Sequence, residues 1–254
     1  MLIGLESAVH VYSTSTSRLV HALRIGTSHT VVGHRICPIN RNHLYVFASS
    51  GQITKWEWTV GKRVCKWDTG CRTIVADLAS DGTDAGVSFF CLQEEKDQKR
   101  RISIRRPVDD GLLHIDILDT PKKITGLRIA HRGQVAVAWA GDHVLTGMKQ
   151  CIDNPIDVSE SVQYTWTDFK SPVDITCADI REGMPQNSKW NPVDIVLGGS
   201  GGSVLVLYDA LNCMFNSKEG PAFRRLHWHR GAVSAVCWSM DGTYAKRKQK
   251  KRKR

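Results

Sequence analysis

The chain has 254 residues, 41% of them hydrophobic, which is enough for one large domain or two small ones. The formal net charge of +10 is concentrated in residues 246–254, which hold eight cations and no acid, so the other 245 residues carry only +2. No apolar run approaches the roughly 20 residues that span a bilayer, and no secretory leader is recognisable at the first residues. The composition therefore predicts a soluble intracellular protein without membrane contact.

Short β-type runs with alternating hydrophobicity follow one another along the whole chain, and long helical periodicity is absent. Glycine-containing turns such as ASSGQ (48–52), SDGT (80–83), AGD (140–142) and GSGG (199–202) separate many of them. The pattern predicts an all-β protein of many strands. The predicted strands are 9–12, 44–49, 53–58, 63–67, 87–92, 102–105, 135–139, 194–198, 203–209 and 232–238.

One strand type recurs, in which a turn leads into an apolar-x-apolar run that ends in a large side chain. It ends at Tyr12, Trp56, Arg105, Met148 and Tyr208, at intervals of 44, 49, 43 and 60 residues. A four-stranded propeller blade repeats every 40–45 residues or so, and the longer intervals contain polar insertions. Residues 1–244 are therefore predicted to form an incomplete β-propeller of about four to five blades, each of four antiparallel strands. Leu2–Tyr12 is expected to be the third strand of its blade, so two strands would be missing upstream.

The motifs resemble those of WD repeats. Residues 48–67 (ASSGQITKWEWTVGKRVCKW) and 197–212 (LGGSGGSVLVLYDALN) match the pattern of a small-residue strand, a glycine turn and an apolar strand that ends in an aromatic residue. The run 225–244 (RLHWHRGAVSAVCWSMDGTY), with 16–26, is similar to the nucleolar WD-repeat subunits of the U3 small nucleolar ribonucleoprotein. The resemblance implies a WD40-type propeller. It also implies that His229, Trp56, Tyr208 and Asp209 are blade-structural, with Tyr208-Asp209 in the place of Trp-Asp.

No motif predicts catalysis, a cofactor, a metal or a small-molecule substrate. His227, His229 and Cys237 provide fewer than the four ligands of a structural zinc site, so a blade-structural His229 is preferred. The sequence GGSGGS (198–203) lacks the G-K-[ST] of a phosphate loop and is predicted to be a hairpin turn. The eight cysteines show no C-x-x-C spacing and are expected to be free thiols. An enzyme that uses a propeller's central funnel is a further alternative, which His and carboxylate clusters on inner strands would favour.

The basic segment 245–254 is predicted to be a disordered tail, because like charges repel and resist ordering. Three interpretations stay open: a nuclear-import signal, an arm that binds RNA or DNA phosphates, or an unselected extension of the reading frame. Its cations are Lys246, Arg247, Lys248, Lys250, Lys251, Arg252, Lys253 and Arg254. A second basic cluster is predicted to be a solvated hairpin rather than an RNA contact, and it comprises Lys96, Lys99, Arg100, Arg101, Arg105 and Arg106.

The function that the resemblance implies is non-catalytic. It is a scaffold in the nucleus and nucleolus that assembles on precursor ribosomal RNA with the U3 ribonucleoprotein and other WD-repeat subunits of the small-subunit processome. That role concerns 18S rRNA processing and is linked to RNA polymerase I transcription. The alternative is a generic WD-repeat adaptor in another nuclear complex, such as a ubiquitin ligase or a chromatin complex. Fold alone does not select between them, since propellers perform many unrelated tasks.

Overall fold

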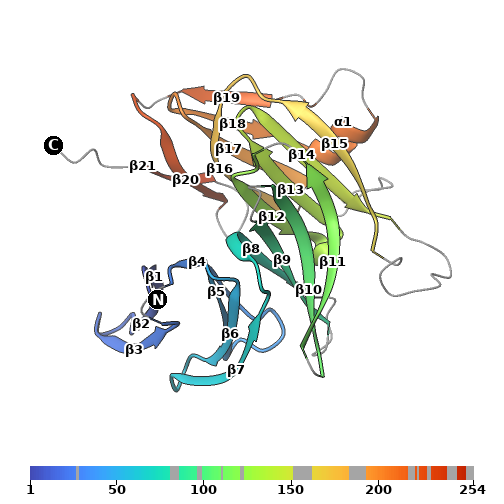
Figure 1. Ribbon diagram of the computed structural model, residues 1–254. Helices are drawn as coiled ribbons and strands as arrows, with labels where there is room; N and C mark the ends of the chain where they lie inside the picture. Colours follow the sequence, from blue (N-terminus) through green and yellow to red (C-terminus); the bar gives the residue numbers. More distant parts are fainter. Residues whose placement is uncertain are drawn as a thin grey trace. The chain divides into compact units, whose positions relative to one another are not determined.

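The computed structural model (Figure 1) consists almost entirely of antiparallel strands. It describes residues 1–26, 29–80, 86–95, 99–109, 111–120, 123–150, 162–182, 193–216, 221, 223–227, 230–238 and 245–249, the last range as backbone only. Within these residues the helical elements are the 3-10 turn η1 (His131–Gly133) and the helix α1 (Ala210–Asn216). The chain divides into two compact units, Met1–Pro121 and Lys122–Arg254.

The first unit contains three sheets, in each of which the strands are paired in chain order. Sheet A comprises β1 (Leu2–Leu5), β2 (Ala8–Tyr12) and β3 (Leu19–Arg24). Sheet B comprises β4 (Val31–Ile36), β5 (His43–Ala48), β6 (Gln52–Glu57) and β7 (Lys62–Asp68). Sheet C comprises β8 (Arg72–Ser80), β9 (Val87–Glu94), β10 (Arg100–Val108) and β11 (Gly111–Thr120).

The second unit follows the same rule. Sheet D comprises β12 (Gly126–Ala130), β13 (Val135–Ala140), β14 (His143–Lys149) and β15 (Tyr164–Lys170). Sheet E comprises β16 (Ile175–Glu182), β17 (Val193–Gly199), β18 (Ser203–Leu207) and β19 (Phe223–His227). Sheet F has two strands, β20 (Val233–Trp238) and β21 (Ala245–Gln249). The helix α1 lies in the connection between β18 and β19, where the sequence predicted no helix.

The predicted repeat is confirmed strand by strand. The five recurring strands are β2, β6, β10, β14 and β18, and each is the last but one of its sheet. One detail was wrong: Leu2–Tyr12 is not a single third strand. It forms β1 and β2 around a turn at Glu6 and Ser7, so sheet A has one strand fewer than its four-stranded neighbours, not two. The turn is only two residues long, and the sequence around it continues the same alternation.

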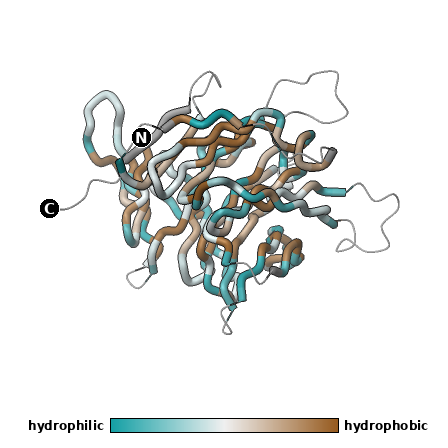
Figure 2. The backbone as a smooth tube through the Cα atoms, turned by 90° about the horizontal axis from the view of Figure 1, so that it is seen from above, coloured by the Kyte–Doolittle hydropathy of each residue, from teal (hydrophilic) through white to brown (hydrophobic). Residues whose placement is uncertain are grey.

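The core lies between successive sheets, because the middle strands bury side chains on both faces. In β5, Leu44 and Val46 lie in the cluster shared with sheet A, whereas Tyr45 and Phe47 lie in the cluster shared with sheet C. This division follows from the two-residue period of a strand. Sheets D and E, and E and F, share apolar clusters in the same way. In Figure 2 the hydrophobic (brown) stretches are concentrated inside the sheets, and the hydrophilic (teal) residues at turns and outer strands.

The basic tail departs from its expected disorder. Ala245–Gln249 form β21 and pair antiparallel with β20, so the prediction of disorder was wrong for these five residues. Strand pairing uses backbone groups, which every residue except proline supplies, and a basic sequence can therefore complete a ladder. Lys246, Arg247 and Lys248 belong to β21; Lys250, Lys251, Arg252, Lys253 and Arg254 lie outside the described residues. In the part of the chain that the structure describes, no helix is both long and apolar enough to cross a membrane.

Candidate functional site

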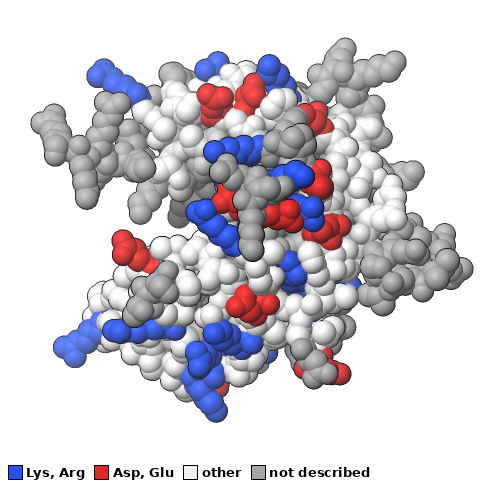
Figure 3. Space-filling view, viewed as in Figure 1, with Lys and Arg blue, Asp and Glu red and all other residues white. Residues whose placement is uncertain are grey.

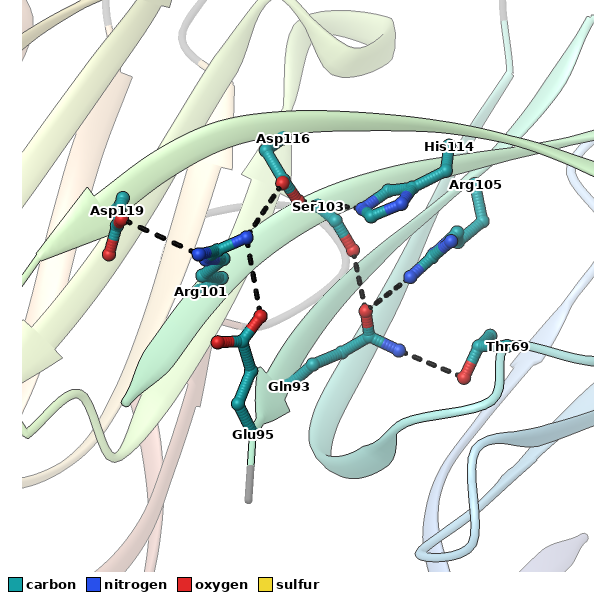
Figure 4. A network of polar contacts seen from close by, with 9 residues as sticks. All are labelled: Thr69, Gln93, Glu95, Arg101, Ser103, Arg105, His114, Asp116 and Asp119. Carbon is teal, nitrogen blue, oxygen red and sulfur yellow. Dashed lines mark hydrogen bonds and ion pairs between the residues drawn. The ribbon is translucent and has the colours of Figure 1, made fainter. Parts of the chain in front are cut away.

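The most extensive buried polar network lies on sheet C and centres on Gln93 of β9 (Figure 4). Its side-chain oxygen accepts hydrogen bonds from the Ser103 hydroxyl (2.9 Å) and from Nη2 of Arg105 (2.7 Å). Its Nε2 donates to Oγ1 of Thr69, which precedes sheet C (2.9 Å). Ser103 and Arg105 are 0% and 5% exposed, so the network replaces the water that these groups lose on folding. It ties the connection between sheets B and C to the middle strands of sheet C.

A second, exposed cluster on the same sheet surrounds Arg101 of β10 (Figure 4). The guanidinium of Arg101 lies 3.2 Å from Glu95, 3.3 Å from Asp116 and 3.8 Å from Asp119. These carboxylates, Glu95 foremost, raise the pKa of Arg101, against a smaller opposing effect of burial. His114 makes a 2.6 Å contact with Asp116. One cation of β10 thus pairs with acids from just past the end of β9 and from β11.

The second basic cluster predicted from the sequence is therefore largely satisfied within sheet C. Arg100 pairs with Glu94 at 3.3 Å, and Arg106 donates to the Ser88 hydroxyl at 3.0 Å. Arg105 was expected on a solvated hairpin, and this was wrong, because β10 directs it into the buried network of Gln93. Lys96 lies outside the described residues.

The polar side chains of these networks are engaged in contacts that stabilise the fold. The Ser103 hydroxyl is fully buried and already donates to Gln93, so it is closed to a substrate. Burial raises the pKa of the Cys91 thiol to about 12, with a smaller opposing effect of Arg105, so this sulfur stays protonated. Among the described residues, no group of three or more His, Cys, Asp and Glu side chains could hold a metal ion.

A third network, which the sequence did not predict, links sheets E and F to the start of α1. Asp194 of β17 forms an ion pair with Arg181 of β16, and its Oδ1 accepts the backbone N–H of Asp209 at 2.9 Å. The Arg181 guanidinium lies 4.4 Å from the ring centroid of Trp238, a cation–π contact. The backbone N–H of Trp238 donates to Asp179 at 3.0 Å. Three elements that are far apart in the sequence are thereby held together.

Two of the predicted blade-structural residues flank the end of β18. Tyr208 is 50% exposed, so it does not pack as a buried aromatic residue would. Asp209 immediately precedes α1 and adopts a φ of +46°, and its carboxylate accepts a hydrogen bond from Nδ2 of Asn212 at 3.1 Å. Asp209 therefore shapes the start of a helix, and Asp194 supplies the acceptor that holds its backbone in place.

The other two predicted blade-structural residues are Trp56 and His229. Trp56 of β6 is buried in the cluster between sheets A and B, and its Nε1–H donates to Oγ1 of Thr54 at 3.0 Å. Trp56 therefore packs between these two sheets. His229 lies outside the described residues. Cys237, which was weighed as a zinc ligand and set aside, has an exposed free thiol; the seven described cysteines are all free thiols.

The stability of the unit formed by sheets A, B and C is expected to fall in mild acid through His34 of β4. Burial, and to a smaller extent Arg35, lower the pKa of His34 below its ordinary value of 6.5. The unfolded chain therefore binds more protons than the folded one below pH 6.5, and the stabilisation by neutral His34, complete above 6.5, is lost as the pH falls toward the folded pKa. Thermal unfolding from pH 7.5 to 5.5 should show a shallower decline in Tm for His34→Gln than for the unmodified protein. Equal slopes would contradict this role of His34.

The stacked sheets of four antiparallel strands, paired in chain order and sharing apolar clusters, define the chain as an incomplete β-propeller of WD-like organisation. Sheets B, C, D and E are its four-stranded blades, and sheets A and F have three and two strands. No family model and no curated protein matches the sequence.

The solved structures similar to this chain include crystal structures of BBS1N in complex with ARL6DN. One, soaked with mercury, matches at a TM-score of 0.62 and 14% identity, over 96% of this chain and 68% of that chain. Another, soaked with lead, matches at a TM-score of 0.62 and 14% identity, over 92% of this chain and 65% of that chain. The present chain thus spans about two thirds of the length of the propeller chains it matches, and at this identity the likeness concerns the fold.

Proposed function

We propose that this chain is a non-catalytic β-propeller scaffold that binds other proteins. The observation that carries the proposal is the way its polar side chains are used: around Gln93 and Asp194, buried polar groups bond to one another within and between sheets. Such networks hold blades in place and leave outer strands and turns for recognition. The similar BBS1N structures contain a protein partner, ARL6DN, which supports a protein-binding role for this fold here.

The complex we propose is the nucleolar machinery for small-subunit ribosomal RNA processing. Support comes from the run 225–244, which resembles the nucleolar WD-repeat subunits of the U3 ribonucleoprotein, and from the cations of residues 246–254. In this role the protein assembles on precursor rRNA with U3 RNA and other WD-repeat subunits, directly or through them, and is linked to RNA polymerase I transcription. Its location is then the nucleolus. The alternative function is an adaptor in a ubiquitin ligase or chromatin complex.

The proposal is tested by affinity purification of the tagged full chain from cells, with the associated RNAs and proteins measured. U3 RNA should be enriched over an abundant spliceosomal RNA, and other WD-repeat subunits of the processome should copurify. Recovery of ligase or chromatin subunits without enrichment of U3 RNA would instead establish the alternative.

Direct RNA binding by the tail is a separate expectation. Each phosphate contact contributes about 0.7 to the log–log salt slope on single-stranded RNA. Because Lys246, Arg247 and Lys248 lie in β21, deletion of 246–254 would also remove the partner strand of β20. Replacing Lys250, Lys251, Arg252, Lys253 and Arg254 by Gln avoids this, and should lower the slope by up to about 3.5. An unchanged slope would show that these five cations do not contact RNA.

A further inference from the structure

The first unit carries a basic strip on β3, β7 and the turn before β7, which is distinct from the basic tail. Figure 3 shows Lys and Arg side chains gathered at the lower left, where Figure 1 draws β3 and β7. In residues 18–24 and 58–68 there is one acidic residue, Asp68, whose carboxylate accepts the backbone N–H of Gly70. The exposed cations of this basic strip are Arg18, Arg24, Lys62, Arg63 and Lys66.

The two parts of the basic strip are adjacent in the structure. Nε2 of His21, in β3, lies 3.1 Å from the carbonyl oxygen of Thr59, in the turn that precedes β7. A Cβ atom on Gly61 of the same turn would lie 2.8 Å from the His21 ring. The surfaces of β3 and β7 therefore meet at this turn and form one continuous strip.

A β-bulge orients the cations of β7. Arg63 is paired with Trp56 and Cys65 with Lys55, so Val64 is the extra residue. The bulge reverses the alternation and places Arg63 and Lys66 on the same face of the sheet, because their partners Trp56 and Thr54 share that face. Bulges commonly re-aim side chains in this way.

These cations are not neutralised within the protein, in contrast to those of sheet C. Arg100 and Arg101 of the same unit lie against Glu94, Glu95 and Asp116. In the part of the chain that the structure describes, Lys62 and Arg63 form no ion pair within 4 Å, although Glu57 of β6 is the cross-strand neighbour of Lys62. Lys66 reaches only a neutral group, the amide oxygen of Gln52, at 2.8 Å when that amide is turned to satisfy its partners. The strip therefore presents a net positive potential to solvent.

Aliphatic side chains are interleaved with these cations and decide the kind of partner. Four of them are 47–59% exposed: Leu19, Val20, Val60 and Val64. The aromatic rings nearby are engaged, since Trp58 donates its indole N–H to the Arg41 carbonyl and Trp67 packs in the core between sheets B and C. Proteins that bind single-stranded RNA stack its bases on free aromatic rings. A surface of cations and aliphatic side chains is instead complementary to a protein segment that carries acidic and aliphatic residues.

We propose that the basic strip is a docking surface for an acidic, aliphatic-rich protein segment. The acidic side chains of that segment pair with Lys62, Arg63 and Lys66, and its aliphatic side chains cover Val60 and Val64. The proposal deepens the proposed scaffold function by naming a class of partner. It does not depend on the nucleolar assignment, because its test uses purified components.

The test measures fluorescence anisotropy of labelled probes with the purified full chain at about 0.15 M salt. The probes are a short peptide of Glu and Leu, its counterparts with Leu replaced by Ser or Glu by Lys, and a uridine oligonucleotide. The Glu–Leu peptide should bind most tightly. The triple variant Lys62→Glu, Arg63→Glu and Lys66→Glu should weaken its binding at least about tenfold and should gain binding of the Lys–Leu peptide.

Two further variants make the result specific. The triple variant Arg132→Glu, Arg224→Glu and Arg230→Glu makes the same charge change at exposed positions of the second unit and should alter binding less than twofold or so. Val60→Ser with Val64→Ser keeps every charge and should weaken the Glu–Leu peptide about three- to tenfold. Tightest binding of the oligonucleotide would overturn the proposal in favour of a nucleic-acid surface. Equal losses in both triple variants, or no binding of the Glu–Leu peptide, would also overturn it.

Discussion

Gly51→Ala is expected to destabilise the unit of sheets A, B and C by about 3 kcal/mol or more, the sum of backbone strain and a steric clash. Gly51, in the turn between β5 and β6, has a φ of +93°, which side-chain-bearing residues rarely adopt. A Cβ atom there would lie 2.2 Å from the carbonyl oxygen of Cys71 and 2.4 Å from Oγ1 of Thr69. Because the first of these is a backbone atom, the clash cannot be relieved by rotating a side chain.

The chain supplies a matched control for this prediction at Gly70. It also has a positive φ, of +70°, but a Cβ atom there would meet nothing within 4 Å. Gly70→Ala therefore measures backbone strain alone and should cost about 1 kcal/mol. In thermal unfolding, Gly51→Ala should lower Tm by roughly 6–12 °C and Gly70→Ala by roughly 2–4 °C. Equal decreases would show that the approach of the Thr69–Cys71 segment does not constrain the turn.

Gln93→Leu is the second large effect, at about 3 kcal/mol. Leucine fills a similar volume but removes the acceptor of the Ser103 hydroxyl and of the Arg105 guanidinium, and the donor to Thr69. Arginine cannot lose its proton to escape burial, so the 5%-exposed guanidinium would remain charged with its acceptor gone. Urea unfolding followed by circular dichroism measures the loss.

Gln150→Leu is the control for this change. The Gln150 side chain is exposed and also bonds a hydroxyl, that of Thr165, so the same substitution there should change stability by less than about 0.5 kcal/mol. In the double variant Gln93→Leu with Arg105→Met, the buried cation is gone as well. Its cost should be smaller than the sum of the two single costs, because Gln93→Leu alone leaves an unpaired buried cation and the double variant leaves none. Strict additivity would contradict a shared network.

The sequence was sufficient to predict the strand architecture. The alternation around Leu44–Ala48 and the turn at Gly51 are local features, and the spacing from Tyr12 to Tyr208 located the third-position strand of five successive sheets. Local patterning failed for elements that are short or that depend on residues from other parts of the chain. The seven-residue helix α1 follows Asp209, which has a positive φ and whose backbone N–H is bound by Asp194 of β17. The segment β21 is a strand because it pairs with β20.

What the sequence alone determined is therefore the β-propeller repeat, since a strand's two-residue period and a turn's glycine are encoded in neighbouring residues. The tertiary structure alone decided which charges are buried, paired or left free. Arg105 and Arg63 look alike in the sequence, yet Arg105 is buried against Gln93, whereas Arg63 is exposed on the last strand of sheet B. The physical reason is that a side chain's partners come from adjacent strands and sheets, so their identity depends on register and stacking, which no short segment specifies.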